Sequence, residues 1–230
     1  MTTIASNLQS VRERIARACA AAGRDVNEVT LLAVSKTFAA DAVREAFAAG
    51  ATAFGENYIQ EAVDKMALLA DLPLRWHCIG PVQSNKTRLV ANHFDWAHSV
   101  DRLKTAQRLS QQRPESLAPL QVCIQVNVDG GATKSGVLPE EAEALAREVA
   151  RLPRLRLRGL MTIPEPSEDY GAQLGVHRCA RALFDRLCDA GLPLDTLSMG
   201  MTADLEAAIH AGSTMVRVGT AIFGTRPPRS

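Results

Sequence analysis

Eight short apolar segments alternate with helical segments along the chain, and this alternation restricts its fold more than any other feature. The apolar segments are short and rich in Val, Ile and Leu, which is typical of strands buried on both faces. The predicted strands are Leu31–Ser35, Ala51–Gly55, Leu74–Ile79, Phe94–Ala97, Leu120–Val128, Leu155–Leu160, Thr196–Ser198 and Met215–Val218. Helices are predicted at Ile4–Ala22, Asp41–Ala49, Tyr58–Ala70, Asn85–Ala91, Arg102–Gln112, Pro139–Arg151, Ala172–Ala190 and Ala203–Ala211, with a final turn at Thr220–Phe223.

This order of elements predicts a parallel sheet whose strands are joined by crossover helices. Eight such units close into a (β/α)8 barrel, and about 200 residues suffice for a compact one. A doubly wound open sheet is the competing architecture, but no G-x-G-x-x-G motif follows the first strand. Because no linker rich in Pro, Gly or Ser divides the chain, we expect residues 1–230 to form one α/β domain, a single TIM barrel with an extra N-terminal helix.

Composition narrows the classes of partner. The 26 basic and 25 acidic residues leave a formal charge of +1, so neither nucleic acid nor an anionic membrane is expected as a partner. The five cysteines form no C-x-x-C pair, which indicates reduced thiols in the cytoplasm, and the histidines show no metal-ligand spacing. The chain shows neither an apolar signal-peptide region nor roughly 18 uninterrupted apolar residues, so we expect a cytoplasmic protein without a membrane span.

A lysine stands where the first predicted strand ends. Lys36 follows the apolar run Leu31–Ser35, and in a barrel the functional groups lie on the loops after the strands. Burial disfavours the charged form of an amine, and a neutral amine is a nucleophile that forms a Schiff base with an aldehyde. The alternative is that Lys36 extends past the end of the strand into solvent.

Two later loops have the composition of an anion site. Ser198–Thr202 combines a glycine and two hydroxyl groups with the start of a helix, and Gly219 and Thr220 form a second small turn after the last strand. Phosphate sites in barrels recur at these last two loops. The alternatives are a helix cap at Thr202 and a plain tight turn at Gly219. With Lys36, the two loops favour a ligand that carries both a phosphate and an aldehyde.

Pyridoxal phosphate fits that description, and Arg217 strengthens the hypothesis. Arg217 lies within the apolar segment Met215–Val218, where a guanidinium needs an acceptor. A pyridine nitrogen would serve, and an arginine partner keeps that nitrogen unprotonated and weakens the cofactor as an electron sink. Pairing of Arg217 with Glu56 or Asp129 remains the alternative.

The motifs in these loops resemble one family, the pyridoxal phosphate homeostasis proteins, also called proline synthetase co-transcribed homologs. The resemblance spans nearly the whole chain and rests on Ala33–Thr37, Phe54–Glu61, Trp76–His77, Ile79–Lys86, Val126–Val128, Lys134–Gly136, Gly159–Met161, Leu197–Met201 and Arg217–Gly224. It implies a barrel of the alanine racemase type (fold type III) in which Lys36 holds pyridoxal 5′-phosphate as a Schiff base and Arg217 faces the ring nitrogen. It further implies that Asn57 and His77 line the ring, and that the phosphate is surrounded by Ser198, Gly200, Thr202, Gly219 and Thr220.

The resemblance also implies a function without an established reaction. The family binds the cofactor and keeps its free concentration in balance, so we expect a monomeric protein that buffers it or delivers it to apo-enzymes, with no catalytic residue. The alternatives are an amino-acid racemase of the same fold and a Schiff-base aldolase without cofactor. A two-base racemase needs a second acid or base opposite Lys36. Tyr58 is the one candidate, and a chain that ends at Ser230 is expected to lack the additional β domain of alanine racemases.

Overall fold

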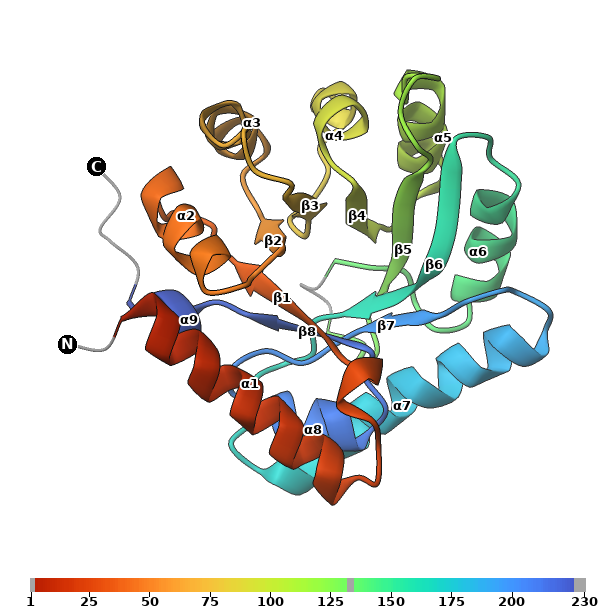
Figure 1. The fold of residues 1–230 in the computed structure, drawn as a ribbon. Coiled ribbons are helices and arrows are strands. Elements are labelled where there is room, and N and C mark those ends of the chain that lie inside the picture. The colour runs from red at the N-terminus through yellow and green to blue at the C-terminus, as the bar shows by residue number, and fades with distance from the viewer. Residues whose placement is uncertain (1–2, 132–134, 226–230) are drawn as a thin grey trace.

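A closed eight-stranded parallel barrel forms the centre of the molecule, with helices around it (Figure 1). The structure is a computed structural model and describes residues 3–131 and 135–225. Each strand pairs with the next along the chain, and β8 closes the barrel by pairing in parallel with β1. The strands are β1 Thr30–Val34, β2 Ala53–Glu56, β3 Arg75–Cys78, β4 Trp96–Val100, β5 Leu120–Val126, β6 Leu155–Thr162, β7 Thr196–Ser198 and β8 Met215–Val218.

A helix follows every strand, as the alternating sequence predicts, and α1 precedes the first strand. The predicted (β/α)8 fold with an extra N-terminal helix is therefore confirmed. The helices are α1 Ile4–Ala21, α2 Ala40–Ala48, α3 Ile59–Leu68, α4 Thr87–His93, α5 Leu103–Gln112, α6 Ala142–Ala150, α7 Tyr170–Asp189, α8 Leu205–His210 and α9 Thr220–Phe223, with a 3-10 turn η1 at Val26–Glu28.

The two faces of each strand pack against different partners because side chains alternate along a strand. In β1, Ala33 belongs to the large apolar core shared with the helices, whereas Leu32 and Val34 belong to a smaller cluster inside the barrel. A second interior cluster contains Trp96 and Met161. The interior also holds buried histidine, serine and arginine side chains, so the barrel centre is only partly apolar.

The fourth strand begins and ends later than predicted. The sequence predicts Phe94–Ala97, whereas β4 runs over Trp96–Val100 and includes His98 and Ser99, both almost completely buried. Two consecutive polar residues look like a loop in the sequence. They are tolerated in this strand because both make hydrogen bonds inside the protein.

The N-terminal helix braces the loops after β7 and β8. The buried face of α1 includes Leu8, Val11 and Ile15. From its other positions, Arg14 donates to the backbone oxygen of Thr202 at 3.0 Å and pairs with Glu206 on α8. The side-chain amide of Asn7 donates to the backbone oxygen of Ile222 at 2.9 Å, so α1 holds α9 as well.

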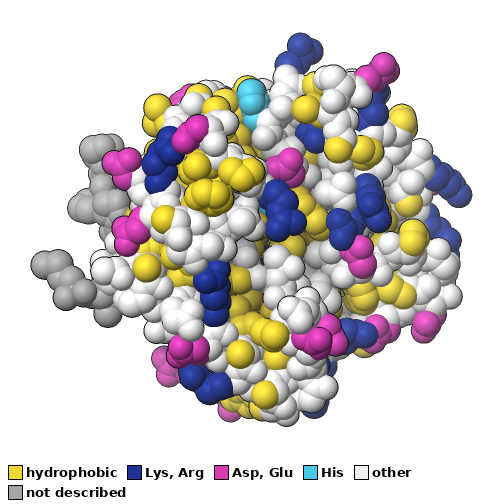
Figure 2. All heavy atoms as spheres, in the orientation of Figure 1, with side chains coloured by type: hydrophobic (Ala, Val, Ile, Leu, Met, Phe, Trp, Pro, Cys, Tyr) yellow, Lys and Arg dark blue, Asp and Glu magenta, His cyan; other side chains and the backbone are white. Residues whose placement is uncertain are grey.

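The surface charges, the cysteines and the helix lengths can be compared with what the composition predicts. Basic and acidic side chains are interspersed on the face shown in Figure 2. All five cysteines are free thiols: three are buried, Cys188 is partly buried and Cys179 is exposed. Among the described residues, no helix is both long and apolar enough to cross a bilayer. Lys134, within one motif of the resemblance, lies outside the described residues.

Candidate ligand-binding site

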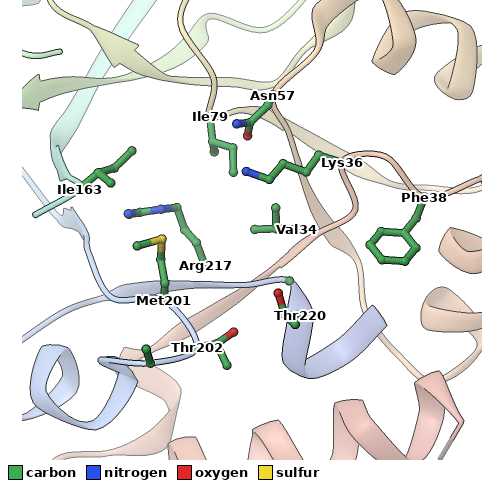
Figure 3. A pocket seen from close by; sticks show the side chains of 12 residues that line it. Val34, Lys36, Phe38, Asn57, Ile79, Ile163, Met201, Thr202, Arg217 and Thr220 are labelled. Atoms are coloured by element: carbon green, nitrogen blue, oxygen red, sulfur yellow. The ribbon is translucent and has the colours of Figure 1, made fainter. Parts of the chain in front are cut away.

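A cavity of about 260 Å³ opens at the carboxyl ends of the strands. This volume lies just below the range of roughly 300–1,000 Å³ that is usual for ligand sites, which suits a small ligand. Six of the predicted site residues line it, namely Lys36, Asn57, Thr202, Arg217, Gly219 and Thr220. The rest of its wall is Val34, Phe38, Ile79, Ile163, Met201 and Ala203 (Figure 3).

Lys36 reaches this cavity because of its position relative to β1. Leu32 and Val34 face the barrel interior, and Lys36 stands two residues further along, on the same side of the chain. Its amine points into the cavity, toward the region of Arg217 (Figure 3). The structure therefore favours the ligand interpretation of this lysine over extension into solvent.

Arg217 projects inward from β8 and is only 4% exposed. Its guanidinium donates from Nη1 to Ser198 Oγ at 2.9 Å and from Nη2 to the backbone oxygen of Thr162 at 2.8 Å. Both acceptors are neutral, so within the described residues no carboxylate contacts this charge. Burial lowers the pKa of Arg217 to about 10, and the side chain remains a cation at neutral pH.

The predicted alternative, a pairing of Arg217 with Glu56 or Asp129, is wrong. Glu56 points away from the barrel interior and contacts Lys65 on α3 at 2.7 Å. Asp129 accepts a hydrogen bond from the backbone N–H of Glu165 at 2.6 Å. Because neither carboxylate reaches Arg217, the guanidinium retains its capacity to bind a ligand acceptor.

Two hydroxyl-bearing turns form the opposite wall of the cavity. Thr220 opens α9 and Thr202 lies in the loop between β7 and α8, and their side chains lie on the same side of the cavity in Figure 3. Asp204 shapes the Thr202 loop by accepting the backbone N–H of Met201 at 2.7 Å. At Gly219 a Cβ would lie 3.2 Å from the backbone oxygen of Val34, so glycine allows the ends of β1 and β8 to approach.

Ser198 and Gly200 stand behind the cavity wall rather than on it. Ser198 is completely buried and accepts from Arg217. Gly200 has φ +92°, a conformation that favours glycine, and its backbone oxygen accepts from the N–H of Arg217 at 2.9 Å. A Cβ at this position would also collide with the side chain of Ala208. Both residues therefore bond to Arg217, and the phosphate contact that the resemblance implies for them stays a prediction.

His77 lies deeper in the barrel than the residues around Lys36, and the ring contact that the resemblance implies for it stays a prediction. It is not among the residues that line the Lys36 cavity. Its ring stacks on Trp96 at 5.1 Å, and it borders a separate cavity of about 300 Å³ where the strands begin. The sequence places His77 on an inward-facing strand position but does not fix its depth along the barrel axis, and the depth separates it from Lys36.

A chain of hydrogen bonds nevertheless joins His77 to Arg217. His77 Nδ1 lies 2.9 Å from His98 Nε2, and His98 Nδ1 lies 3.1 Å from Ser198 Oγ. Since a guanidinium only donates, Ser198 Oγ accepts from Arg217 and its hydroxyl proton can point to His98 Nδ1. His98 then carries its proton on Nε2 and donates to His77. In this arrangement of protons each neutral ring has one tautomer.

Burial keeps both histidines neutral. It lowers the pKa of His98 to about 3, with the charge of Arg217 adding to the effect. Burial also lowers the pKa of His77 well below its usual value, with smaller contributions from His98 and Arg75. Two neutral rings leave Arg217 as the only cation of this interior chain.

The sequence analysis considered polar residues and did not predict the apolar wall of the cavity. Ile79 and Ile163 follow β3 and β6 directly, and their position just past strand ends was the available signal. Ile163 is 37% exposed and lines the mouth of the cavity. These residues give the cavity an apolar side suited to a flat ring.

Comparison with known proteins identifies the class and then the family. The family model described as the alanine racemase N-terminal domain matches residues 6–227, so the fold and cavity define a barrel of that class. The pyridoxal phosphate homeostasis protein of Pseudomonas aeruginosa is 62% identical over 98% of this chain and 97% of its own length. That of Escherichia coli K12 is 54% identical over 98% of each chain.

A solved structure agrees with these relatives. PipY of Synechococcus elongatus PCC7942, solved with pyridoxal phosphate bound, has a TM-score of 0.84 and 37% identity, covering 96% of this chain and 100% of its own. The chain belongs to the pyridoxal phosphate homeostasis protein family, as the motifs in its sequence indicate.

The neutral histidines predict how stability depends on pH. As pH falls below about 6.5, the unfolded chain binds protons at histidines that stay neutral when folded, so the free energy of unfolding decreases toward pH 3. His98→Asn removes one such group. Between about pH 7 and pH 4, we expect the free energy of unfolding of His98→Asn, measured by urea denaturation, to decrease by on the order of 2 kcal/mol less than that of the wild type. The exposed His93→Asn is the control, and an unchanged pH dependence in His98→Asn would contradict the assignment.

Proposed function

We propose that this chain binds pyridoxal 5′-phosphate covalently through Lys36 and takes part in intracellular homeostasis of the cofactor. One observation carries the proposal: an amine and a guanidinium from neighbouring strands β1 and β8 converge on a cavity whose far wall has two hydroxyl-bearing turns. The amine of Lys36 can capture the aldehyde of the cofactor, and the guanidinium of Arg217, which has no carboxylate contact, can donate to its ring nitrogen. The two small turns can bind its phosphate.

The polar groups of the cavity fit this cofactor. Its aldehyde supplies a carbonyl carbon that a lysine amine can capture with loss of water. Asn57 lines the cavity, and its Oδ1 is buried without a hydrogen-bond partner among the described residues. Such an atom is costly unless a ligand satisfies it. Thr202 and Thr220 offer hydroxyl donors to a phosphate at the far wall.

Arg217 makes strong electron withdrawal by the pyridine ring of a bound cofactor unfavourable. It can only donate hydrogen bonds, so a ring nitrogen that faces it stays an unprotonated acceptor. The buried chain from Ser198 to His77 holds the guanidinium in one orientation and supplies no proton at neutral pH. The site is therefore better suited to binding the cofactor tightly than to stabilising a carbanion during a reaction.

The site offers no obvious second base. Among the described residues that line the cavity, Lys36 and Arg217 are the only ionisable ones. Tyr58, the candidate from the sequence, is 39% exposed and is not part of the lining. We therefore propose binding without turnover, by one domain that spans residues 1–230 and acts as a monomer. The proposed setting is the cytoplasm, with apo-enzymes as recipients and neither nucleic acid nor membrane as partner.

Lys36→Ala tests the attachment. Purified wild-type protein incubated with pyridoxal phosphate is expected to show a visible absorption band and a borohydride-reducible adduct at one residue. Lys36→Ala is expected to lose both, because no other lining residue in the described part of the chain has an amine. Lys104→Ala, on the exposed side of α5, is the matched control. Full retention of the reduced adduct in Lys36→Ala would refute the proposal.

A racemase assay tests the absence of turnover. Wild-type protein loaded with cofactor is incubated with L-alanine or L-serine, and the D-isomers are measured by chiral chromatography. We expect no more product than with Lys36→Ala, because proton return to the opposite face needs a second acid, which the lining formed by residues 3–131 and 135–225 does not supply. Racemisation that depends on Lys36 would favour the racemase alternative.

A trapping experiment tests delivery. The loaded chain is mixed with a pyridoxal phosphate-dependent apo-enzyme in the presence of a phosphatase that destroys free cofactor. Direct delivery predicts reactivation of the apo-enzyme at a rate that the phosphatase leaves unchanged. Reactivation that disappears with the phosphatase would show release into solution, which supports buffering and contradicts direct delivery.

A further inference from the structure

A buried ionic cluster lies directly behind the turn that carries Lys36. It consists of Ser35, Glu56 and Lys65, which are 0%, 0% and 5% exposed. Lys65 Nζ lies 2.7 Å from Glu56 Oε1, and Ser35 Oγ donates to the same oxygen at 2.7 Å. Ser35 directly follows β1, Glu56 is the last residue of β2, and Lys65 comes from α3. Burying these two charges has a large desolvation cost in free energy, so we expect the cluster to have a structural role.

The turn itself has an unfavourable backbone. The N–H of Phe38 donates to the oxygen of Ser35 at 3.1 Å, which makes Lys36 and Thr37 the two central residues of a β-turn. Thr37 has φ +69°, a value that turns of type II require at this position and that usually selects glycine. A β-branched residue rarely adopts this conformation, so surrounding contacts must hold it.

Helix α3 supplies those contacts on both sides of Lys36. Lys65 Nζ donates to the backbone oxygen of Ser35 at 2.9 Å. Glu61 Oε1 accepts the backbone N–H of Thr37 at 3.0 Å and lies 3.7 Å from Lys65 Nζ. The two peptide groups that flank the Cα of Lys36 are thus each bonded to a charged side chain of α3.

We propose that Glu61 and Lys65, with Glu56 as the buried partner of Lys65, are positioning residues that hold the Lys36 turn in its strained form and aim the amine into the cavity. The inference rests on the proposed function, because it assigns these residues a purpose in cofactor binding. Charge-assisted hydrogen bonds to both peptide groups are the interactions that can offset an unfavourable φ. The oxygen of Ser35 also accepts from the N–H of Phe38, so the turn bond and the two side chains of α3 act on the same short segment.

Glu61 is the residue to change. Removing Lys65 would leave Glu56 as an unpaired buried carboxylate and destabilise the whole protein. Glu61 has a side chain that is 40% exposed, so Glu61→Ala should fold. Glu61→Gln keeps an oxygen that can accept from Thr37. Glu143→Ala on α6 is the matched control, because Glu143 is also 40% exposed and also pairs with a basic residue four positions later.

The first measurement needs no cofactor. Hydrogen exchange of the Thr37 amide in the full chain is expected to accelerate about tenfold in Glu61→Ala, because the charge-assisted bond to this amide is lost. The acceleration is expected to be small in Glu61→Gln and absent in Glu143→Ala. Exchange of Thr37 at the wild-type rate in Glu61→Ala would overturn the inference.

The second measurement is the dissociation constant for pyridoxal phosphate, followed by the visible band. Glu61→Ala is expected to bind about tenfold more weakly than Glu143→Ala at equal melting temperature of the cofactor-free proteins, and Glu61→Gln to recover most of the loss. Equal affinities of the two alanine variants would refute the positioning role while leaving the Lys36 adduct intact. A wild-type protein that forms no Lys36-dependent adduct would instead refute the proposed function, and the exchange data would then stand alone.

Discussion

The pairing of the last strand with the first is the interaction on which the candidate site depends. Lys36 and Arg217 are far apart in sequence, and the parallel register that places Leu32 beside Arg217 and Ala33 beside Val218 brings their strand ends to the same rim. Closing so long a segment of chain is entropically costly, and the barrel recovers that cost through burial on both faces of every strand. A site at this seam forms only when the whole ring of strands has closed.

Much of this arrangement could be predicted from the sequence. The eight apolar segments predicted the order of strands. The rule that loops after strands carry function selected Lys36, Thr202, Gly219 and Thr220, a guanidinium within an apolar strand selected Arg217, and the resemblance added Asn57. All six line the cavity. Depth along the barrel axis could not be predicted, because alternation tells which side of the strand a residue faces and not its level. His77 and Ser198 therefore fell on the correct side but below the cavity.

The side of the sheet to which a side chain points was harder to predict for Glu56 than for any other residue of these motifs. It stands at the carboxyl end of β2 among rim residues, yet alternation turns it toward α3, where Lys65 covers it. Lys65 lies in the middle of an ordinary amphipathic helix, and nothing in its sequence neighbourhood marks it as buried. The polar interior from His77 to Arg217 was equally hidden, since its members come from four different strands. Contacts between distant elements decide such positions.

The contacts of α1 give this helix a thermodynamic connection to the cavity. Through Arg14 it is bonded to the loop of Thr202, and through Asn7 to the helix that Thr220 begins. Linkage is reciprocal: whatever stabilises those two turns also tightens the docking of α1, and detachment of α1 loosens the turns by the same free energy. The resistance of this segment to a protease would therefore report on occupancy of a pocket that the segment never touches.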